Sequence, residues 1–222
     1  MLSSPFLSNF VMLKSKFPNF THNHHPLRCA KGAERVYHLS VVYGGGDHRG
    51  DHGSLALASG RGYLGTVIFL VRKGADVHAI GDEALRWASE NGHLEVVKLL
   101  IESGADVHAW DDDALRCASV HGHLDVVRLL VLSGANVHAN NDNALINAAH
   151  NGHLEVVRFL TLSGANTHAQ SEEALRYASE NGHLDMVKFL VGKGADVHAS
   201  DDKALRCASG NGHLEVVKFL VL

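Results

Sequence analysis

The most constraining feature of this sequence is a unit of 30 residues that recurs without any change in length. Copies of the unit start at Ser54, Ala84, Ala114, Ala144, Ala174 and, incompletely, at Ala204. A segment this short cannot bury its own apolar side chains, but stacked copies can cover one another. The fixed period therefore predicts an elongated array of stacked units.

Each unit has the pattern of two short helices joined by a tight turn. In the clearest copy, residues 84–90 are mostly good helix formers, and the glycine-containing turn at 91–93 interrupts them. Apolar side chains recur at helical spacing over residues 94–103, which predicts a second helix. Residues 105–109 then form a predicted extended loop that leads to an acidic turn. The fold class is therefore an all-α solenoid of helix–turn–helix units.

Several positions of the unit hold the same residue in every copy, and two of them bear on packing. The small residue of the first helix is Ala58, Ala88, Ala118, Ala148, Ala178 or Ala208, which allows close helix contact. The first residue of the second helix is Leu64, Leu94, Leu124, Leu154, Leu184 or Leu214. We expect this second line to form the buried ladder of the array.

These units resemble the ankyrin repeat. The resemblance is carried by Asn-Gly-His-Leu-Glu-Val-Val-Lys at residues 91–98 and Gly-Ala-Asp-Val at residues 104–107, which match that family's second helix and loop. It covers residues 54–222 and recurs six times. The usual ankyrin period is about 33 residues, so three residues are missing before the first helix. Ala-Leu-Arg stands in place of Thr-Pro-Leu-His, and a histidine replaces the asparagine that usually follows the loop valine.

The resemblance implies an ankyrin solenoid with short hairpin tips that binds a partner protein through those tips and through the first-helix face. It also implies that the protein is not an enzyme. The short period combined with Ala-Leu-Arg-x-Ala-Ser is similar to the ankyrin proteins of giant DNA viruses.

The chain divides into a repeat region and a different N-terminal region. The predicted units are 54–83, 84–113, 114–143, 144–173, 174–203 and a partial unit at 204–222. Residues 1–25 are predicted to be a disordered segment, and residues 26–53 are interpreted as a degenerate repeat followed by a glycine-rich loop. All three prolines lie before residue 27.

Composition argues against several classes of function. The repeats carry more acidic than basic residues, and we expect no row of Lys or Arg along one face, so nucleic-acid binding is not predicted. No apolar run approaches the ~18 residues that span a bilayer. Three cysteines, Cys29, Cys117 and Cys207, do not suggest a disulfide framework. We therefore expect a monomer in the cytoplasm, the host-cell cytoplasm if the protein is viral, with the nucleus as an alternative.

The 18 histidines raise the question of a metal site. Two ladders recur, one in the loops (His78, His108, His138, His168, His198) and one in the turns (His93, His123, His153, His183, His213). Equivalent residues on stacked helices lie about 10 Å apart, whereas zinc ligands lie within about 2.1 Å of one ion. We expect both ladders to hydrogen-bond the loop backbone, with no metal or cofactor.

Two alternatives involve the N-terminal region. One is a histidine-rich metal-binding protein that uses His22, His24, His25, His48 and His52. The other is an adaptor that recruits degradation machinery through the same region. A Ser–His pair, as at Ser89 and His93, occurs four times in the chain, which does not fit a single catalytic centre.

The candidate binding residues are those that vary between copies. At the tips they are Ile80, Trp110, Asn140 and Gln170, together with Asp111, Asp112 and Asp113 next to Trp110. On the first-helix face they are Glu90 and Glu180. Because the tips are rich in Asp and Glu, the predicted partner is a protein with a basic segment. Most copies have an arginine at the position of Arg86, and we expect these arginines to form ion pairs with the acidic tips of the same chain.

Overall fold

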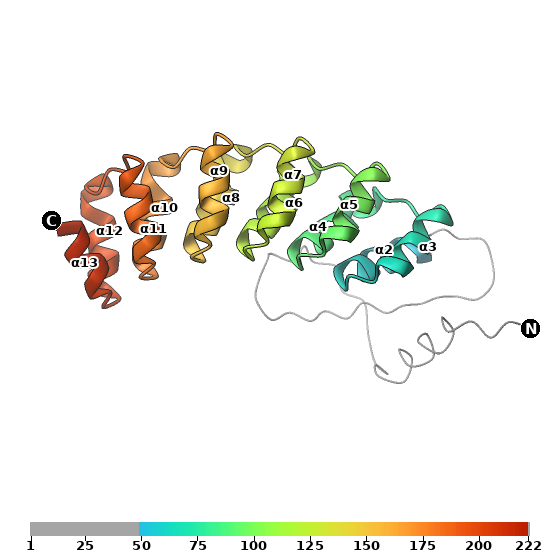
Figure 1. Cartoon of the computed structure of the whole chain (residues 1–222), viewed down its shortest axis with the longest axis horizontal. Coiled ribbons are helices and arrows are strands. Elements are labelled where there is room, and N and C mark those ends of the chain that lie inside the picture. The colour runs from blue at the N-terminus through green and yellow to red at the C-terminus, as the bar shows by residue number, and fades with distance from the viewer. Residues whose placement is uncertain (1–48, 222) are drawn as a thin grey trace, which may run out of the picture.

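A computed structural model describes residues 49–221 of the chain, with side chains from residue 53. Within that range the protein is a curved row of helix pairs and contains no strand. Figure 1 shows the pairs stacked side by side, with α2 and α3 at one end and α12 and α13 at the other. The predicted all-α solenoid is confirmed.

The helices recur with the period of the sequence. The pairs are α2 (Arg49–Gly60) and α3 (Leu64–Arg72), α4 (Ala79–Glu90) and α5 (Leu94–Glu102), α6 (Ala109–Val120) and α7 (Leu124–Leu132), α8 (Ala139–His150) and α9 (Leu154–Leu162), α10 (Ala169–Glu180) and α11 (Leu184–Gly192), and α12 (Ala199–Gly210) and α13 (Leu214–Val221). From α4 onward, each first helix begins 30 residues after the previous one. The N-terminal segment and the degenerate repeat of the sequence prediction lie largely outside the described residues.

The turn within each pair depends on a glycine. Gly92 has a φ of 73°, which is the left-handed conformation that ends a helix without steric cost for this residue. The next backbone N–H, that of His93, donates to the carbonyl of Ala88 at 2.9 Å. The chain can therefore reverse within three residues and begin α5 at Leu94.

The core lies between the two layers of helices. The alanine line is buried as expected, and Ala88 and Ala118 are fully inaccessible to solvent. The expectation for the leucine line is wrong: Leu94 is only partly buried, and Leu214 is 60% exposed. Leucine at this position is the first residue of its helix, beside the exposed turn, so only part of its side chain reaches the core. In α5, α7, α9 and α11 the fully buried leucine is instead Leu100 or its equivalent, which is Leu130, Leu160 or Leu190.

The tips, where the sequence predicts an acidic turn, have an unusual backbone conformation. From α4 onward, each first helix includes its tip within its bounds, but three residues of the tip have left-handed dihedral angles. Trp110, Asp111 and Asp112 have φ values of 54°, 55° and 58°. The same conformation recurs in the four equivalent tips at 80–82, 140–142, 170–172 and 200–202. The tip is thus a tight left-handed turn, which is shorter than a β-hairpin.

Candidate protein-binding surface

The left-handed turn gives the side chains of each tip different exposures to solvent. The first residue, for example Trp110, is exposed, whereas the third, Asp112, is buried. A left-handed conformation costs roughly 1–2 kcal/mol per residue for side chains other than glycine. Contacts elsewhere must therefore stabilise the turn, and the buried third residue makes them.

The buried acid connects one layer to the next. Asp112 is 5% exposed, and its Oδ1 accepts a hydrogen bond from the backbone N–H of Asn136 at 2.8 Å. The same atom lies 3.1 Å from Nδ1 of His108. Equivalent bonds to the next layer join Asp82 to Asp106, Asp142 to Asn166, and Glu172 to Asp196. Asp112 was expected to face a partner, but its carboxylate is occupied inside the array.

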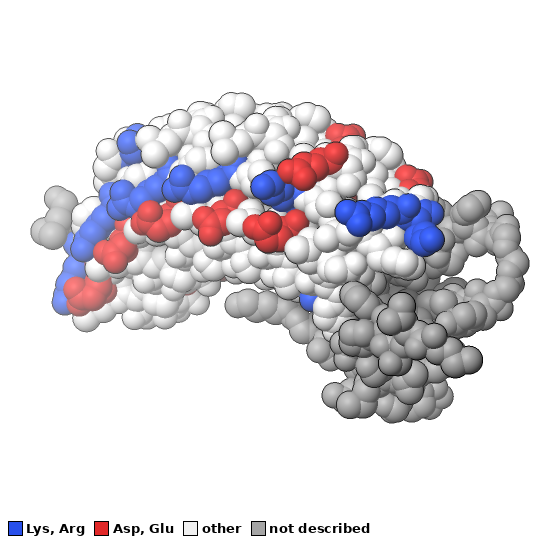
Figure 2. All heavy atoms as spheres, turned by 45° about the vertical axis from the view of Figure 1, so that its right-hand side comes forward, with Lys and Arg blue, Asp and Glu red and all other residues white. Residues whose placement is uncertain are grey.

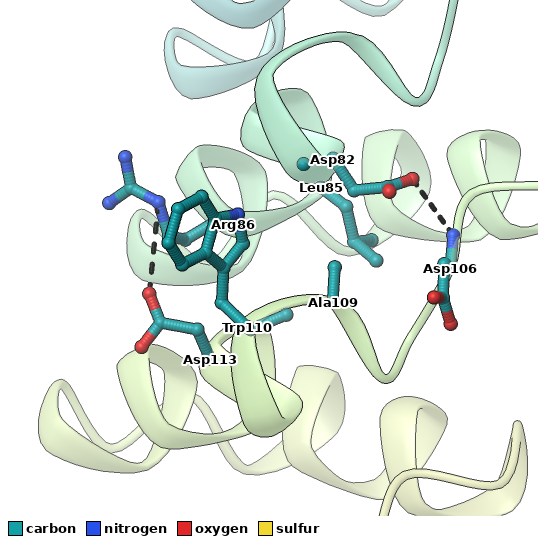
Figure 3. A pocket seen from close by; sticks show the side chains of 9 residues that line it. Asp82, Leu85, Arg86, Asp106, Ala109, Trp110 and Asp113 are labelled. Carbon is teal, nitrogen blue, oxygen red and sulfur yellow. Dashed lines mark hydrogen bonds and ion pairs between the residues drawn. The ribbon is translucent and has the colours of Figure 1, made fainter.

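Asp113 lies in an ion-pair cluster between two layers. Its carboxylate pairs with Arg116 in its own helix and lies 3.8 Å from Nε of Arg86 in the layer before (Figure 3). Arg86 also lies 3.4 Å from Glu83, whose pKa is raised by burial, although Arg86 acts in the opposite direction. The expected internal pairing of the arginines with the tips is confirmed.

Trp110 is the largest exposed side chain of the tips. It is 68% exposed, and Ile80 in the layer before is 66% exposed. The indole lies so close to Gly81 that a Cβ atom on this glycine would overlap with Nε1 of the ring. Figure 3 shows the ring beside Arg86, at the edge of a shallow pocket. The pocket is lined by Gly81, Asp82, Leu85, Arg86, Asp106, Ala109, Trp110, Asp113 and Ala114.

The remaining predicted residues fall into two places. Asn140 and Gln170 are exposed at the next two tips, and the side-chain amide of Gln170 donates to the carbonyl of Asn141 at 3.3 Å. Glu90 and Glu180 lie at the opposite end of their first helices from the tips. Glu180 accepts from Arg176 at 2.9 Å. The structure therefore brings Trp110 together with Ile80 and Asp111, and it separates them from Glu90 and Glu180.

The turn histidines act between layers. Nε2 of each ring lies 2.8–3.1 Å from the carbonyl oxygen that ends the first helix of the preceding layer, which confirms the expected backbone role. The pairs are His93 with Gly60, His123 with Glu90, His153 with Val120, His183 with His150, and His213 with Glu180. Burial lowers the pKa of His123, and the neighbouring rings of His121, His153 and His93 lower it further, although the bond to Glu90 acts in the opposite direction.

The loop histidines have a different partner from the one expected. Each ring contacts the carboxylate four residues later, as His138 does with Asp142 at 3.0 Å. At the last tip, the hydrogen bond from His198 to Asp202 raises the pKa of this histidine. Within the described residues, no group of His, Cys, Asp or Glu side chains could hold a metal ion. The proposed N-terminal histidine cluster and the adaptor segment lie essentially outside that part of the chain.

The structure also shows a row of cations that the sequence interpretation missed. Figure 2 shows Lys and Arg side chains in a continuous row, with a row of Asp and Glu beside it. The basic row consists of Lys98, Arg128, Arg158, Lys188 and Lys218, and all five are exposed. The acidic row consists of Glu95, Asp125, Glu155, Asp185 and Glu215. The expectation that no such row exists was therefore wrong, and aligning the fifth residue of each second helix would have revealed it.

Comparison with known protein families gives the same architecture. A model for ankyrin repeats in three copies matches residues 34–111, 55–141, 114–201 and 145–222. No curated protein sequence matches the chain significantly. None of the helices between residues 49 and 221 is long and apolar enough to cross a membrane. Ankyrin repeats are generally non-catalytic modules for protein–protein interaction, and on this match the chain belongs to the ankyrin-repeat family.

Proposed function

We propose that this protein is a non-catalytic scaffold that binds a partner protein at its tips, with Trp110 as the anchor. The observation that carries the proposal is the exposure of the Trp110 ring, at 68%. Equivalent tips have Asn140, Gln170 and Ser200 at this position, so the left-handed turn does not require an aromatic side chain. Exposed tryptophans are strongly enriched among the residues that dominate binding energies at protein interfaces.

The charges near Trp110 support a partner with a basic segment. Asp111 is exposed beside the ring, and Asp106 is exposed at the wall of the same pocket. Asp112 is buried and Asp113 is paired with arginines, so neither offers a free carboxylate. Acidic groups at the rim of an interface mainly accelerate association and select against like-charged partners. Asp111 and Asp106 are therefore the proposed selectors of a basic chain.

A larger partner would extend over further residues of the predicted set. Asn140 and Gln170 continue the exposed surface along the tips of the next two layers. Glu90 and Glu180 would take part only if the partner also covers the first helices as far as the turns. We assign the tip residues to the primary contact and these two glutamates to a secondary contact.

The proposed setting is a reducing compartment, the cytoplasm or the nucleus, where the chain acts as a monomer. Cys117 is buried and Cys207 is partly buried, and neither forms a disulfide with another described residue. The similarity of the short repeat to the ankyrin proteins of giant DNA viruses would place it in the cytoplasm of a host cell.

The test is a binding screen on the full chain with a library of short peptides rich in Lys and Arg. For the peptides that bind, Trp110→Ala should weaken binding by at least about 30-fold, which corresponds to about 2 kcal/mol. The matched control is Phe69→Ala, which removes an aromatic side chain that is 58% exposed on α3, away from the tips. Equal affinities for Trp110→Ala and the parent protein would exclude Trp110 as the anchor.

A second variant tests the charge. Asp111→Asn should slow association with little effect on dissociation, and raised salt should reduce the difference from the parent protein. The matched control is Lys203→Gln, which removes a positive charge at the last tip instead of a negative one.

A further inference from the structure

The exposed face of the second helices carries two leucines that are largely accessible to solvent. Leu132 and Leu162 end α7 and α9, and they are 84% and 83% exposed. These are the highest values among the large apolar side chains of the described residues. Equivalent positions on α5 and α11 hold Glu102 and Gly192, so the fold does not need leucine there.

Each leucine lies one helical turn beyond a cation of the basic row. Leu132 follows Arg128 by four residues, and Leu162 follows Arg158 by four residues, which places each pair on one side of its helix. The basic row continues beyond both leucines to Lys98 on α5 and to Lys188 on α11. Two central apolar positions are thus flanked on one side by a longer row of positive charge.

The cations are partly held in place by the neighbouring layers. The guanidinium of Arg128 lies 4.9 Å from the ring centre of Phe159, and that of Arg158 lies 4.8 Å from the ring centre of Phe189. Such stacking fixes the direction of a long side chain while its N–H groups stay accessible. Arg158 also lies 3.5 Å from Glu155, in an exposed pair of the kind that contributes little to stability.

The order of charges on each second helix restricts what can dock. From the first turn to the last, α7 presents Asp125, then Arg128, then Leu132, and α9 repeats this order. A nucleic-acid backbone along the basic row would also meet the acidic row one turn away, which is unfavourable. A protein segment avoids that repulsion if its acids lie over the basic row and its apolar side chains lie over the leucines.

The spacing of the layers selects the shape of the segment. Neighbouring helices pack about 10 Å apart, and seven residues of an α-helix rise about 10.5 Å. Apolar side chains seven residues apart therefore match Leu132 and Leu162, and acidic residues on one flank match the cations. We propose that the face of α5, α7, α9 and α11 is a second docking surface, for an acidic amphipathic helix of a partner protein.

This surface is separate from the tips. The test measures the affinity of the full chain for synthetic helical peptides. The probe peptide has two leucines seven residues apart, about 10.5 Å along a helix, with glutamates along one flank. The control peptides are one with the same composition but the leucines five residues apart, and one with lysines in place of the glutamates. The probe should bind, and both controls should bind at least about tenfold more weakly, because they lose the apolar or the charge match.

Variants of the protein locate the binding. Leu132→Ser/Leu162→Ser and Arg128→Glu/Arg158→Glu should each weaken binding of the probe at least about tenfold. Lys203→Glu is the charge control, and Trp110→Ala should leave the affinity unchanged, which separates this surface from the tip site. Thermal unfolding of each variant checks that the array is intact.

Several results would overturn the proposal. These are no binding of the probe, equal binding of the control with misplaced leucines, or unchanged affinity of the leucine variant. Two further results would assign the surface to another occupant. Duplex or single-stranded DNA that binds more tightly than the probe, and loses its affinity with Arg128→Glu/Arg158→Glu, would indicate nucleic acid. A dimer in sedimentation that Leu132→Ser/Leu162→Ser abolishes would indicate a second copy of this chain.

Discussion

The carboxylate of Asp112 accepts a hydrogen bond at 2.8 Å from the backbone N–H of Asn136, which lies in the following layer. This bond joins a tip to the loop 24 residues later, and the same separation recurs at Asp82, Asp142 and Glu172. The acid at the third tip position therefore has a structural reason that is independent of any partner. An acidic tip contains two kinds of carboxylate, one that stabilises the array and one that faces solvent.

Substitutions at adjacent aspartates of one tip should separate these two kinds. Both residues have a left-handed φ, so alanine costs similar backbone strain at either position and that cost cancels in the comparison. Asp112→Ala also leaves the N–H of Asn136 without its acceptor, so we expect it to lower the free energy of unfolding by about 2 kcal/mol more than Asp111→Ala does. Asp112→Asn keeps an acceptor oxygen and should recover part of the loss. Urea unfolding measures all three, and equal effects of the two alanine variants would contradict the assignment.

The corrected position of the core gives a second prediction. Leu160 is fully buried in α9, whereas Leu154 at the start of the same helix is only partly buried. Leu160→Ala should lower the free energy of unfolding by about 2–5 kcal/mol. Leu154→Ala should lower the free energy of unfolding by less than half as much, because fewer of the side-chain atoms that it removes are buried. A larger loss at Leu154 in the same urea titration would restore the leucine line as the main buried ladder.

Gly81 and Trp110 should be energetically coupled. A side chain at Gly81 would overlap with the indole, whereas the other tips hold Asp111, Asn141, Ser171 and Asp201 at the glycine position. Gly81→Asn should therefore lower the melting temperature and shift the fluorescence of Trp110. In a Trp110→Asn background, Gly81→Asn should have a much smaller effect. The double-mutant cycle is expected to give a coupling of about 0.5–3 kcal/mol, and additive effects would show that the ring does not rest on Gly81.

The half-buried turn histidine His123 should make stability dependent on pH. Its pKa is below the ordinary value because burial disfavours the charged form, so the unfolded chain binds the proton more readily. This contribution to stability is present above pH about 6.5, the ordinary histidine pKa, and is lost as the pH falls through and below that value. Unfolding free energies at pH 7.5 and pH 5, the latter about 1.5 units below that pKa, should differ less in His123→Gln than in the parent protein. An unchanged difference would show that His123 does not contribute.

The period and the pairing of helices could be predicted from the sequence because each depends on local features. The glycine of the turn sets where α4 ends, and the apolar spacing after Leu94 sets the second helix. The role of Asp112 could not be predicted in this way. Its partner lies in another layer, and nothing in the string of acids distinguishes it from Asp111. Which acid is buried depends on the left-handed turn, and this turn contains side chains that rarely adopt such a conformation.

Only part of the candidate binding surface could be predicted from the sequence. The exception at Trp110 is visible once the copies are aligned, because a polar residue occupies the position in later tips. The contact with Gly81 is not visible, since it joins two layers. The basic row was missed for a different reason. Lys98 and Arg128 alternate in the sequence with acids and apolar residues, and they form a row only after the second helices stand side by side.

The two hydrogen bonds between layers also fix the spacing that a partner must match. His123 attaches the turn end of one layer to the layer before, while Asp112 attaches the tip end to the layer after. Attachment at both ends of the first helix restrains rotation of one layer against the next. The distance between equivalent surface residues of successive layers is then nearly constant along the array. A partner that contacts two layers must match this distance. Inserting one residue into the partner, between the segments that contact the two layers, should therefore disrupt binding even when every contacting side chain is kept.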